Sequence, residues 1–195
     1  YIINVRAYNI LYKSKSHYCM NEMNGKDSKP LVYLRALEME DLEFLYEVEN
    51  DRSLWGVGCT NVPYSRQMLI DYIASASADI YADRQMRLII ENGQHETVGM
   101  VDLINFDPRH LRAEIGIVIK DEVRGKGYAQ EAIRQLLVYS KEILHLHQLY
   151  AIVSTKNEKA VKMLHSVGFE GSKMLKEWLF EGDFYVDAYF FQCFL

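Results

Sequence analysis

The sequence predicts a mixed α/β domain in which one layer of β-strands is flanked by helices. Three observations lead to this fold class. Short runs rich in β-branched and aromatic residues recur along the chain, segments with apolar residues at helical spacing alternate with them, and turn-forming residues separate the two. The 195 residues contain no internal repeat and are enough to bury one substantial core.

The first half of the domain is expected to supply one strand, two helices and a hairpin. These elements are a strand over 31–35, a helix over 38–50, a helix over 65–81, and paired strands over 87–91 and 97–105. Ser65 is a favourable N-cap for the second helix, whose buried stripe would include Met68 and Leu69. Asn92 and Gly93 form the strongest short turn signal available for the hairpin.

The second half is expected to supply three strands or strand pairs and two helices. These are a strand over 112–120, a helix over 124–144, a strand over 149–154, a helix over 157–166, and a hairpin of strands over 173–180 and 184–193. Within 112–120 the alternation assigns one face to apolar side chains and the other to the remaining ones: Ala113, Ile115, Ile117 and Ile119 against Glu114, Gly116 and Val118. Gly168 is expected to end the helix over 157–166.

Composition excludes several classes of protein. The 22 Lys and Arg against 27 Asp and Glu give a net charge of −5, which disfavours a general nucleic-acid binder or a basic membrane-surface protein. No apolar run approaches the length of a spanning helix. The cysteines, Cys19, Cys59 and Cys193, are odd in number and widely spaced, so we expect a reducing, cytoplasmic environment.

The N-terminal residues differ in pattern from the rest of the chain. Residues 1–29 contain a stretch rich in Lys, Asn and Ser without a sustained period, and the organised pattern starts only at about Leu31. We therefore expect 1–29 to be either an N-terminal extension or a gene-model remnant, and 30–195 to form the single functional domain.

The turn over 124–129 is the segment with the clearest chemistry. Gly125 and Gly127 join a predicted strand to a predicted long helix, where glycine lets backbone N–H groups approach a ligand and the helix adds its positive end. Arg124 and Lys126 add full positive charges, which suit a phosphate or pyrophosphate. The segment is neither a Walker loop nor a Rossmann fingerprint, because no GK[ST] follows and Gln130 occupies the third glycine position.

The sequence resembles the GNAT superfamily of N-acetyltransferases. Arg124-x-x-Gly127-x-Ala129 matches its acyl-CoA pyrophosphate loop, and Asn157-x-x-Ala160 followed by Gly168-Phe169 matches the signature of the next helix. Within the superfamily, the chain looks like the branch of spermidine N-acetyltransferases and ribosomal-protein alanine acetyltransferases. The resemblance covers about 31–193 and implies a GNAT fold, with a central mixed, mostly antiparallel sheet flanked by about four helices.

The resemblance implies acetyl-CoA as cosubstrate. We expect no metal, because the His145 and His147 pair has no third ligand in view. Backbone groups of Ile117, Val118 and Ile119 would contact the pantetheine arm and polarise the thioester carbonyl. The pyrophosphate would be held by the loop residues Arg124, Gly125, Lys126, Gly127, Tyr128 and Ala129. Asn157 and Lys159 would contact the cofactor from the next helix, where Asn157 is equally a plausible N-cap.

The implied reaction is direct attack of a primary amine on the thioester. Glu114, on the polar face of its strand, is the candidate base, although an exposed glutamate or a partner of Arg112 is as plausible. In spermidine acetyltransferases a tyrosine in N-x-x-A-x-x-x-Y acts as general acid, and Leu164 occupies that position here. A thiol of pKa ~8.5 is a tolerable leaving group without an acid.

The acceptor remains open at this point. It could be a polyamine-like small amine or a protein N-terminus, and a non-catalytic acyl-CoA-binding or sensing module is the alternative function. Trp55 and Tyr64 could line an acceptor pocket or pack in the core. A cluster of acidic residues could attract a cationic acceptor or form a solvated helix face: Glu38, Glu40, Asp41, Glu43, Glu47, Glu49 and Asp51. Relatives implied by the resemblance often form homo-oligomers.

Overall fold

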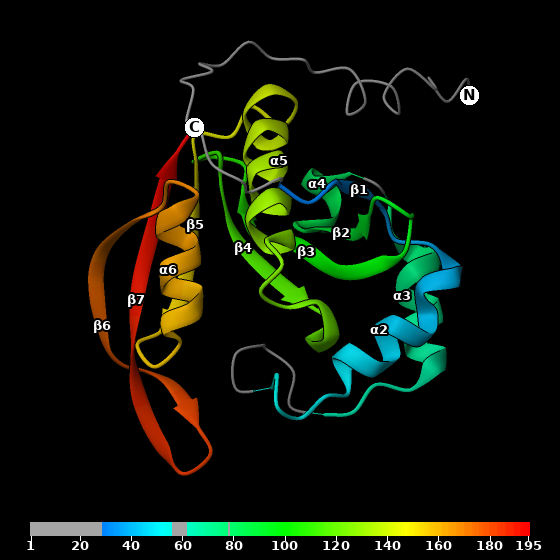
Figure 1. Cartoon of the computed structure of the whole chain (residues 1–195), viewed down its shortest axis with the longest axis horizontal. Coiled ribbons are helices and arrows are strands. Elements are labelled where there is room, and N and C mark those ends of the chain that lie inside the picture. The colour runs from blue at the N-terminus through cyan, green and yellow to red at the C-terminus, as the bar shows by residue number, and fades with distance from the viewer. Residues whose placement is uncertain (1–28, 56–61, 78) are drawn as a thin grey trace.

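The core of the molecule is a seven-stranded sheet (Figure 1). The computed structural model describes residues 29–55, 62–77 and 79–195. The strands are β1 (Val32–Ala36), β2 (Met86–Asn92), β3 (Thr97–Asp107), β4 (Arg112–Ile119), β5 (Gln148–Ser154), β6 (Glu170–Glu181) and β7 (Phe184–Phe194), in the order β1-β2-β3-β4-β5-β7-β6. Only the β4–β5 pair is parallel, which confirms the predicted mixed, mostly antiparallel sheet.

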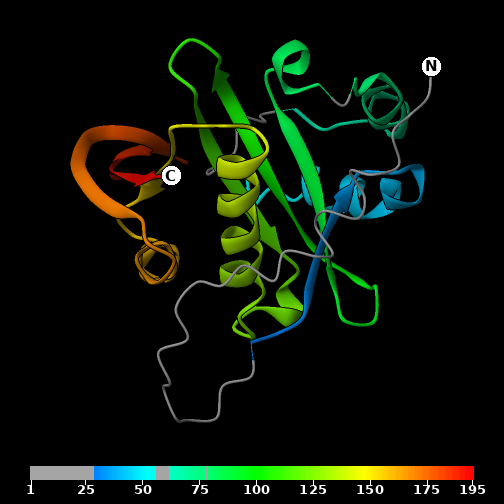
Figure 2. The same ribbon diagram turned by 90° about the horizontal axis from the view of Figure 1, so that it is seen from above.

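Helices cover both faces of the sheet (Figure 2). The described part of the chain contains five α-helices, one more than predicted: α2 (Leu42–Glu49), α3 (Arg66–Ser75), α4 (Ile80–Asp83), α5 (Tyr128–Glu142) and α6 (Glu158–Ser166). The larger core lies between the sheet and α5 with α6, and it buries Ile133, Leu136 and Leu164. A smaller cluster on the other face joins α2 and α3 to β2 and β3 through Leu45 and Leu69.

The strand patterns predicted from the sequence are largely confirmed. In β4, Ala113, Ile115 and Ile119 are buried in the larger core and Ile117 packs against it, as the alternation requires. The β2–β3 hairpin also forms. Its connection spans 93–96, and the Asn92 side-chain oxygen accepts hydrogen bonds from backbone N–H groups two and four residues later.

The predicted single helix over 65–81 is wrong. Ser65 does cap α3, but the helix ends at Ser75, and α4 begins only at Ile80. Ser77 bonds to the Asp83 carboxylate through both its N–H and its hydroxyl, so polar side chains compete with the helical backbone in this segment. The predicted buried stripe is also only partly correct, because Met68 is half exposed.

The predicted helix over 124–144 begins four residues later than expected. Gly125 and Gly127 adopt φ angles of 80° and 86°, in the left-handed region, and helix α5 starts at Tyr128. The helix over 38–50 is likewise preceded by a 3₁₀ turn (Met39–Asp41) before α2. The predicted extension over 1–29 lies, except for Lys29, outside the described residues.

Candidate active site

Strands β4 and β5 separate after a short paired stretch. Their residues are in register only at Arg112↔Gln148, Ala113↔Leu149 and Glu114↔Tyr150, whereas β4 continues to Ile119. On its other edge, β5 pairs with β7 along its whole length. Among the described residues, the β5-facing edge of 115–119 therefore has no partner strand, and its backbone groups are available to an extended ligand.

The backbone of this free edge has a defined direction. A Cβ atom built on Gly99 of β3 would lie 2.3 Å from the Val118 carbonyl oxygen, so the backbone carbonyl of Val118 points toward β3. The carbonyl of Ile119 points the other way, where it accepts a hydrogen bond from Arg124 Nε at 3.0 Å. Backbone N–H and C=O groups alternate in direction along a strand. The backbone groups of Ile117 therefore point to the open edge together with those of Ile119. Of the three predicted backbone ligands, these two face the opening.

The turn that follows β4 exposes a row of donors. The backbone N–H groups of 125–129 make no hydrogen bond within the described part of the chain. No side chain caps the N-terminus of α5, and its positive dipole end adds to these donors. Gly125 has no atom within 4 Å of a built Cβ, so nothing in the described structure covers the turn there. This arrangement suits an anion such as a pyrophosphate.

The charged and apolar residues of the turn are arranged around these donors. Arg124 forms an ion pair with Asp121 at 2.7 Å in addition to its bond to the end of β4. Lys126 is exposed. Tyr128 and Ala129 are partly buried and pack against the larger core, which fixes the first turn of α5.

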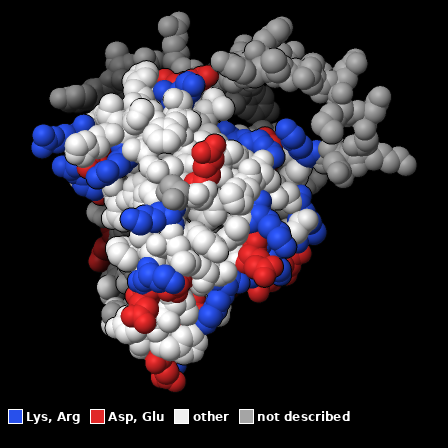
Figure 3. Space-filling view, turned by 90° about the vertical axis from the view of Figure 1, so that its left-hand side faces the viewer, with Lys and Arg blue, Asp and Glu red and all other residues white. Residues whose placement is uncertain are grey.

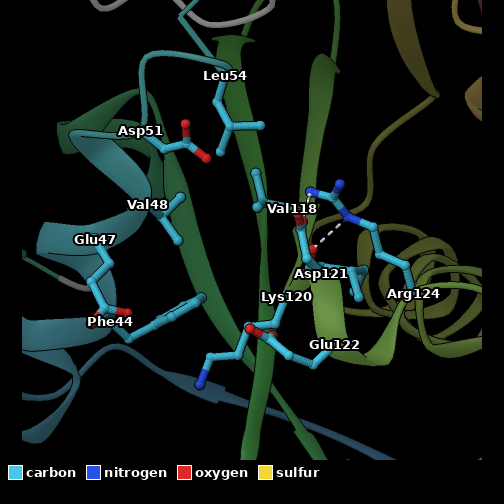
Figure 4. A pocket seen from close by; sticks show the side chains of 11 residues that line it. Phe44, Glu47, Val48, Asp51, Leu54, Val118, Lys120, Asp121, Glu122 and Arg124 are labelled. Atoms are coloured by element: carbon cyan, nitrogen blue, oxygen red, sulfur yellow. Dashed lines mark hydrogen bonds and ion pairs between the residues drawn. The ribbon is translucent and has the colours of Figure 1, made fainter.

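A cavity of about 380 Å³ adjoins the end of β4 (Figure 4). It lies between helix α2 with its following loop on one side and the segment 118–124 on the other. Its lining comprises Phe44, Glu47, Val48, Asp51, Leu54, Val118, Ile119, Lys120, Asp121, Glu122 and Arg124. Four carboxylates therefore face two cations. Lys120 Nζ lies 4.9 Å from the centre of the Phe44 ring.

Asp51 is the carboxylate that Figure 4 shows directed into this cavity from the loop after α2. Hydrogen bonds from the Ser53 side chain and backbone lower the pKa of Asp51, and the positive charge of Arg124 lowers it further. Asp51 is therefore ionised at neutral pH. An acidic wall of this kind favours a cationic ligand.

The other members of the predicted acidic cluster have different roles. Asp41 is buried against Arg35, Glu43 pairs with Arg66 on the surface, and Glu49 pairs with the partly buried Arg87. Glu47 and Asp51 remain at the cavity. The structure thus divides one sequence cluster into structural ion pairs and a smaller group at the site.

Glu114 lies where β4 and β5 part. Its carboxylate accepts a hydrogen bond from the side-chain amide of Asn105 at 2.9 Å, and Tyr150 is its register partner on β5. Arg112, the partner considered from the sequence, pairs instead with Asp107 at 3.2 Å. Sequence reasoning did not identify Asn105 or Tyr150, because neither belongs to a recognisable motif.

Helix α6 brings two predicted residues close to the opening and buries a third. Asn157 is the N-cap, with its side chain accepting from the Ala160 N–H at 3.1 Å. Lys159 is exposed on the first turn. Leu164 is only 2% exposed and packs in the larger core, so it offers no proton donor.

Trp55 and Tyr64 lie on the loop side of α2. The Trp55 indole donates to the Glu49 carbonyl at 3.0 Å, and the Tyr64 backbone exchanges two hydrogen bonds with the Asn50 side chain. Both aromatic side chains are partly buried, and neither lines the cavity. The lining residues Phe44, Val48 and Leu54 gave no sequence signal beyond ordinary apolar spacing.

The described residues contain no group of three or more His, Cys, Asp or Glu side chains that could hold a metal ion. None of their helices is long and apolar enough to span a membrane.

The fold and the free edge of β4 define an acyl-CoA-dependent acetyltransferase, and comparisons with known proteins agree. The family model described as "Acetyltransferase (GNAT) domain" matches residues 32–170, so the chain belongs to the GNAT family. The spermidine N(1)-acetyltransferase of Vibrio cholerae is 33% identical over 150 residues, which cover 76% of this chain and 85% of that protein.

Solved structures give the same result. The spermidine N-acetyltransferase of V. cholerae in complex with CoA and spermine has a TM-score of 0.73 at 32% identity, covering 84% of this chain and 95% of that one. A dodecameric structure of the V. cholerae enzyme has a TM-score of 0.70 at 33% identity, covering 84% and 93%. The predicted family and fold are confirmed, and so is N-acetyltransferase as the enzyme class.

Proposed function

We propose that this protein transfers the acetyl group of acetyl-CoA to a primary amine of a polyamine. The single observation that carries the proposal is the unpaired edge of β4, which leads directly into the row of free N–H groups over 125–129. An extended pantetheine arm fits the first feature and a pyrophosphate fits the second. The similarity to spermidine acetyltransferases supports the choice of acceptor.

The residues divide the work as follows. Ile117 and Ile119 offer backbone groups to the pantetheine and thioester, and the loop holds the pyrophosphate. A polyamine amine with a pKa near 10.4 must lose a proton before it attacks, which costs about 4.6 kcal/mol at pH 7. Glu114 receives that proton. Attack on the carbonyl carbon forms the new C–N bond, and the C–S bond then breaks to release the thiolate. The second proton of the amine leaves the nitrogen in this step and passes through water to the thiolate, which is released as the free thiol.

The acidic cavity supports a cationic acceptor. Glu47, Asp51, Asp121 and Glu122 outnumber the two cations that line it. A polyamine carries several positive charges, so its non-reacting amines would gain most from this surface. A protein N-terminus is the second candidate acceptor, because its pKa of about 7.7–8.0 demands less of a base.

Ligand-dependent stability and turnover test the proposal together. Acetyl-CoA at about 100 times its Kd should stabilise the protein by ~2.7 kcal/mol, whereas ATP should give no comparable shift in melting temperature. Release of free thiol should then follow addition of spermidine, and basic peptides serve as the comparison acceptors. Absence of any shift with acetyl-CoA would contradict the assignment of the 124–129 loop.

Binding without turnover defines the alternative function. A non-catalytic acyl-CoA sensor would be stabilised by acetyl-CoA and would release no thiol with any amine in the panel. The replacement of the family tyrosine by Leu164 is the feature that motivates this alternative.

Restoring the tyrosine should change the rate little. We expect Leu164→Tyr to keep kcat within about threefold of the wild type, because a thiol of pKa ~8.5 leaves without protonation. Leu164→Phe is the matched control, since it adds similar bulk to the buried position but no hydroxyl. If Leu164→Tyr exceeded the phenylalanine variant by the 10²–10⁴-fold typical of a general acid, proton donation would be the missing step.

We infer a homo-oligomer and a cytoplasmic location. The β6–β7 hairpin exposes large apolar side chains: Met174, Trp178, Phe180, Phe184 and Tyr185. Uncharged side chains dominate the face of the molecule seen in Figure 3. The dodecameric relative supports assembly, and the exposed apolar hairpin offers a contact surface for it. Light scattering of the purified chain measures the oligomeric state directly.

A further inference from the structure

A bulge in β3 brings Asn105 beside Glu114. The register between β3 and β4 is continuous up to Ile104↔Glu114 and resumes only at Asp107↔Arg112. Asn105 lies within this irregularity with a φ angle of 51°, in the left-handed region. Asparagine tolerates this conformation better than most residues. The bulge therefore turns residue 105 out of the regular pleat of the strand.

The side chain of Asn105 uses this displacement to reach β4. Its Nδ2 atom donates a hydrogen bond to Glu114 Oε2 at 2.9 Å. A hydrogen bond at this distance fixes the orientation of the carboxylate group. A neutral amide gives this orientation without forming an ion pair that would compete with a cationic acceptor.

Tyr150 bounds Glu114 on the opposite side. It is the β5 register partner of Glu114, and its ring stacks on Phe190 of β7 with ring centres 5.4 Å apart. Burial raises the pKa of Tyr150, and the charge of Glu114 raises it further, so the phenol remains protonated at neutral pH. Arg112 and Asp107, the nearest charged groups along the strands, are already paired with each other.

We propose that Asn105 is a positioning residue for acetyl transfer: from the β3 bulge it holds the Glu114 carboxylate, with Tyr150 on the opposite side, in the orientation that receives the proton of the acceptor amine. This inference rests on the proposed function, in which Glu114 is the base. Asn105 acts through Glu114 and is exposed, so its contribution to folding is small.

Two substitutions separate positioning from structure. Asn105→Gly removes the amide but suits the left-handed backbone, so the melting temperature should stay constant or rise while kcat/KM for spermidine falls about 10-fold or more. Asn105→Asp places a like charge beside Glu114. It should lower kcat/KM further and move the acidic limb of the pH–rate profile to higher pH, because a neighbouring carboxylate favours the protonated form. The KM for acetyl-CoA should not change in either variant.

His145→Gly is the matched control. His145 is exposed and has a φ angle of 53°, so it adopts the same left-handed backbone conformation as Asn105 but does not contact Glu114. Its replacement by glycine should therefore leave kcat/KM unchanged. If the wild-type protein turns over spermidine and both Asn105 variants show the same rate and pH profile as the wild type, the positioning role of Asn105 is overturned and the proposed function stands. Absence of turnover in the wild-type protein with every amine would overturn the proposed function, and the positioning role with it.

Discussion

Arg35→Ala should lower the free energy of unfolding by about 3–5 kcal/mol. Arg35 donates to both oxygens of Asp41, at 2.6 and 2.8 Å, and its Nε atom bonds to Glu91. Asp41 is 3% exposed and Glu91 8% exposed. Removing the guanidinium leaves the buried Asp41 carboxylate without a cation and leaves Glu91 with only His95, whose Nδ1 atom lies 2.9 Å from the Glu91 carboxylate. The penalty for these buried carboxylates dominates the cost. Urea denaturation at pH 7 measures it.

Arg66→Ala is the matched control for Arg35→Ala. Arg66 also makes a two-bond contact with one carboxylate, Glu43, but the side chains are 51% and 64% exposed. Solvent screens this pair, so its loss should cost much less than the loss of Arg35. Equal costs for the two variants would show that burial does not determine the strength of these ion pairs.

The cost of Arg35→Ala should also depend on pH. Burial alone would raise the pKa of Asp41 and of Glu91, but the hydrogen bonds and charge of Arg35, together with the Glu38 N–H at Asp41 and His95 at Glu91, outweigh it and lower both pKa values. Carboxyl groups with a lowered folded-state pKa stabilise the protein fully above their unfolded pKa values, near 4. The stabilisation is lost as the pH falls through the folded-state values. The difference between wild type and Arg35→Ala should therefore be largest at neutral pH and shrink below about pH 4.

The fold was predictable where the pattern is local. The alternation of β4 depends on residues close in sequence and is confirmed, and the long helix after the glycine turn forms as α5. The break between α3 and α4 was not predicted, because it depends on Ser77 bonding to the side chain of Asp83 instead of continuing the helix. Helical spacing of apolar residues does not reveal that competition.

The candidate site was predictable in part for the same reason. The loop over 124–129 combines glycines, charges and a helix start within one short segment, so its chemistry is visible in the sequence. Asn105 meets Glu114 only because a bulge shifts the β3–β4 register, and Glu49 meets Arg87 across 38 positions of chain. Side chains that meet only through strand register, or through the packing of segments far apart in the sequence, leave no local pattern in the sequence.

The largest effect on activity is expected from Glu114→Gln. The variant keeps the size of the side chain and a hydrogen-bonding oxygen for Asn105 but cannot take up the proton of the amine, so kcat/KM for spermidine at pH 7 should fall about 10²–10⁴-fold. An amine with a pKa near 10.4 becomes about 100 times more abundant in its neutral form between pH 7 and pH 9. The defect of Glu114→Gln should therefore shrink as the pH rises, because bulk solvent then removes the proton that Glu114 normally accepts.

Glu142→Gln, an exposed substitution at the end of α5, is the control and should retain wild-type kinetics at every pH. A Glu114→Gln enzyme with the wild-type rate and pH profile would mean that water alone deprotonates the acceptor amine. The Glu114 carboxylate would then serve only to attract the acceptor.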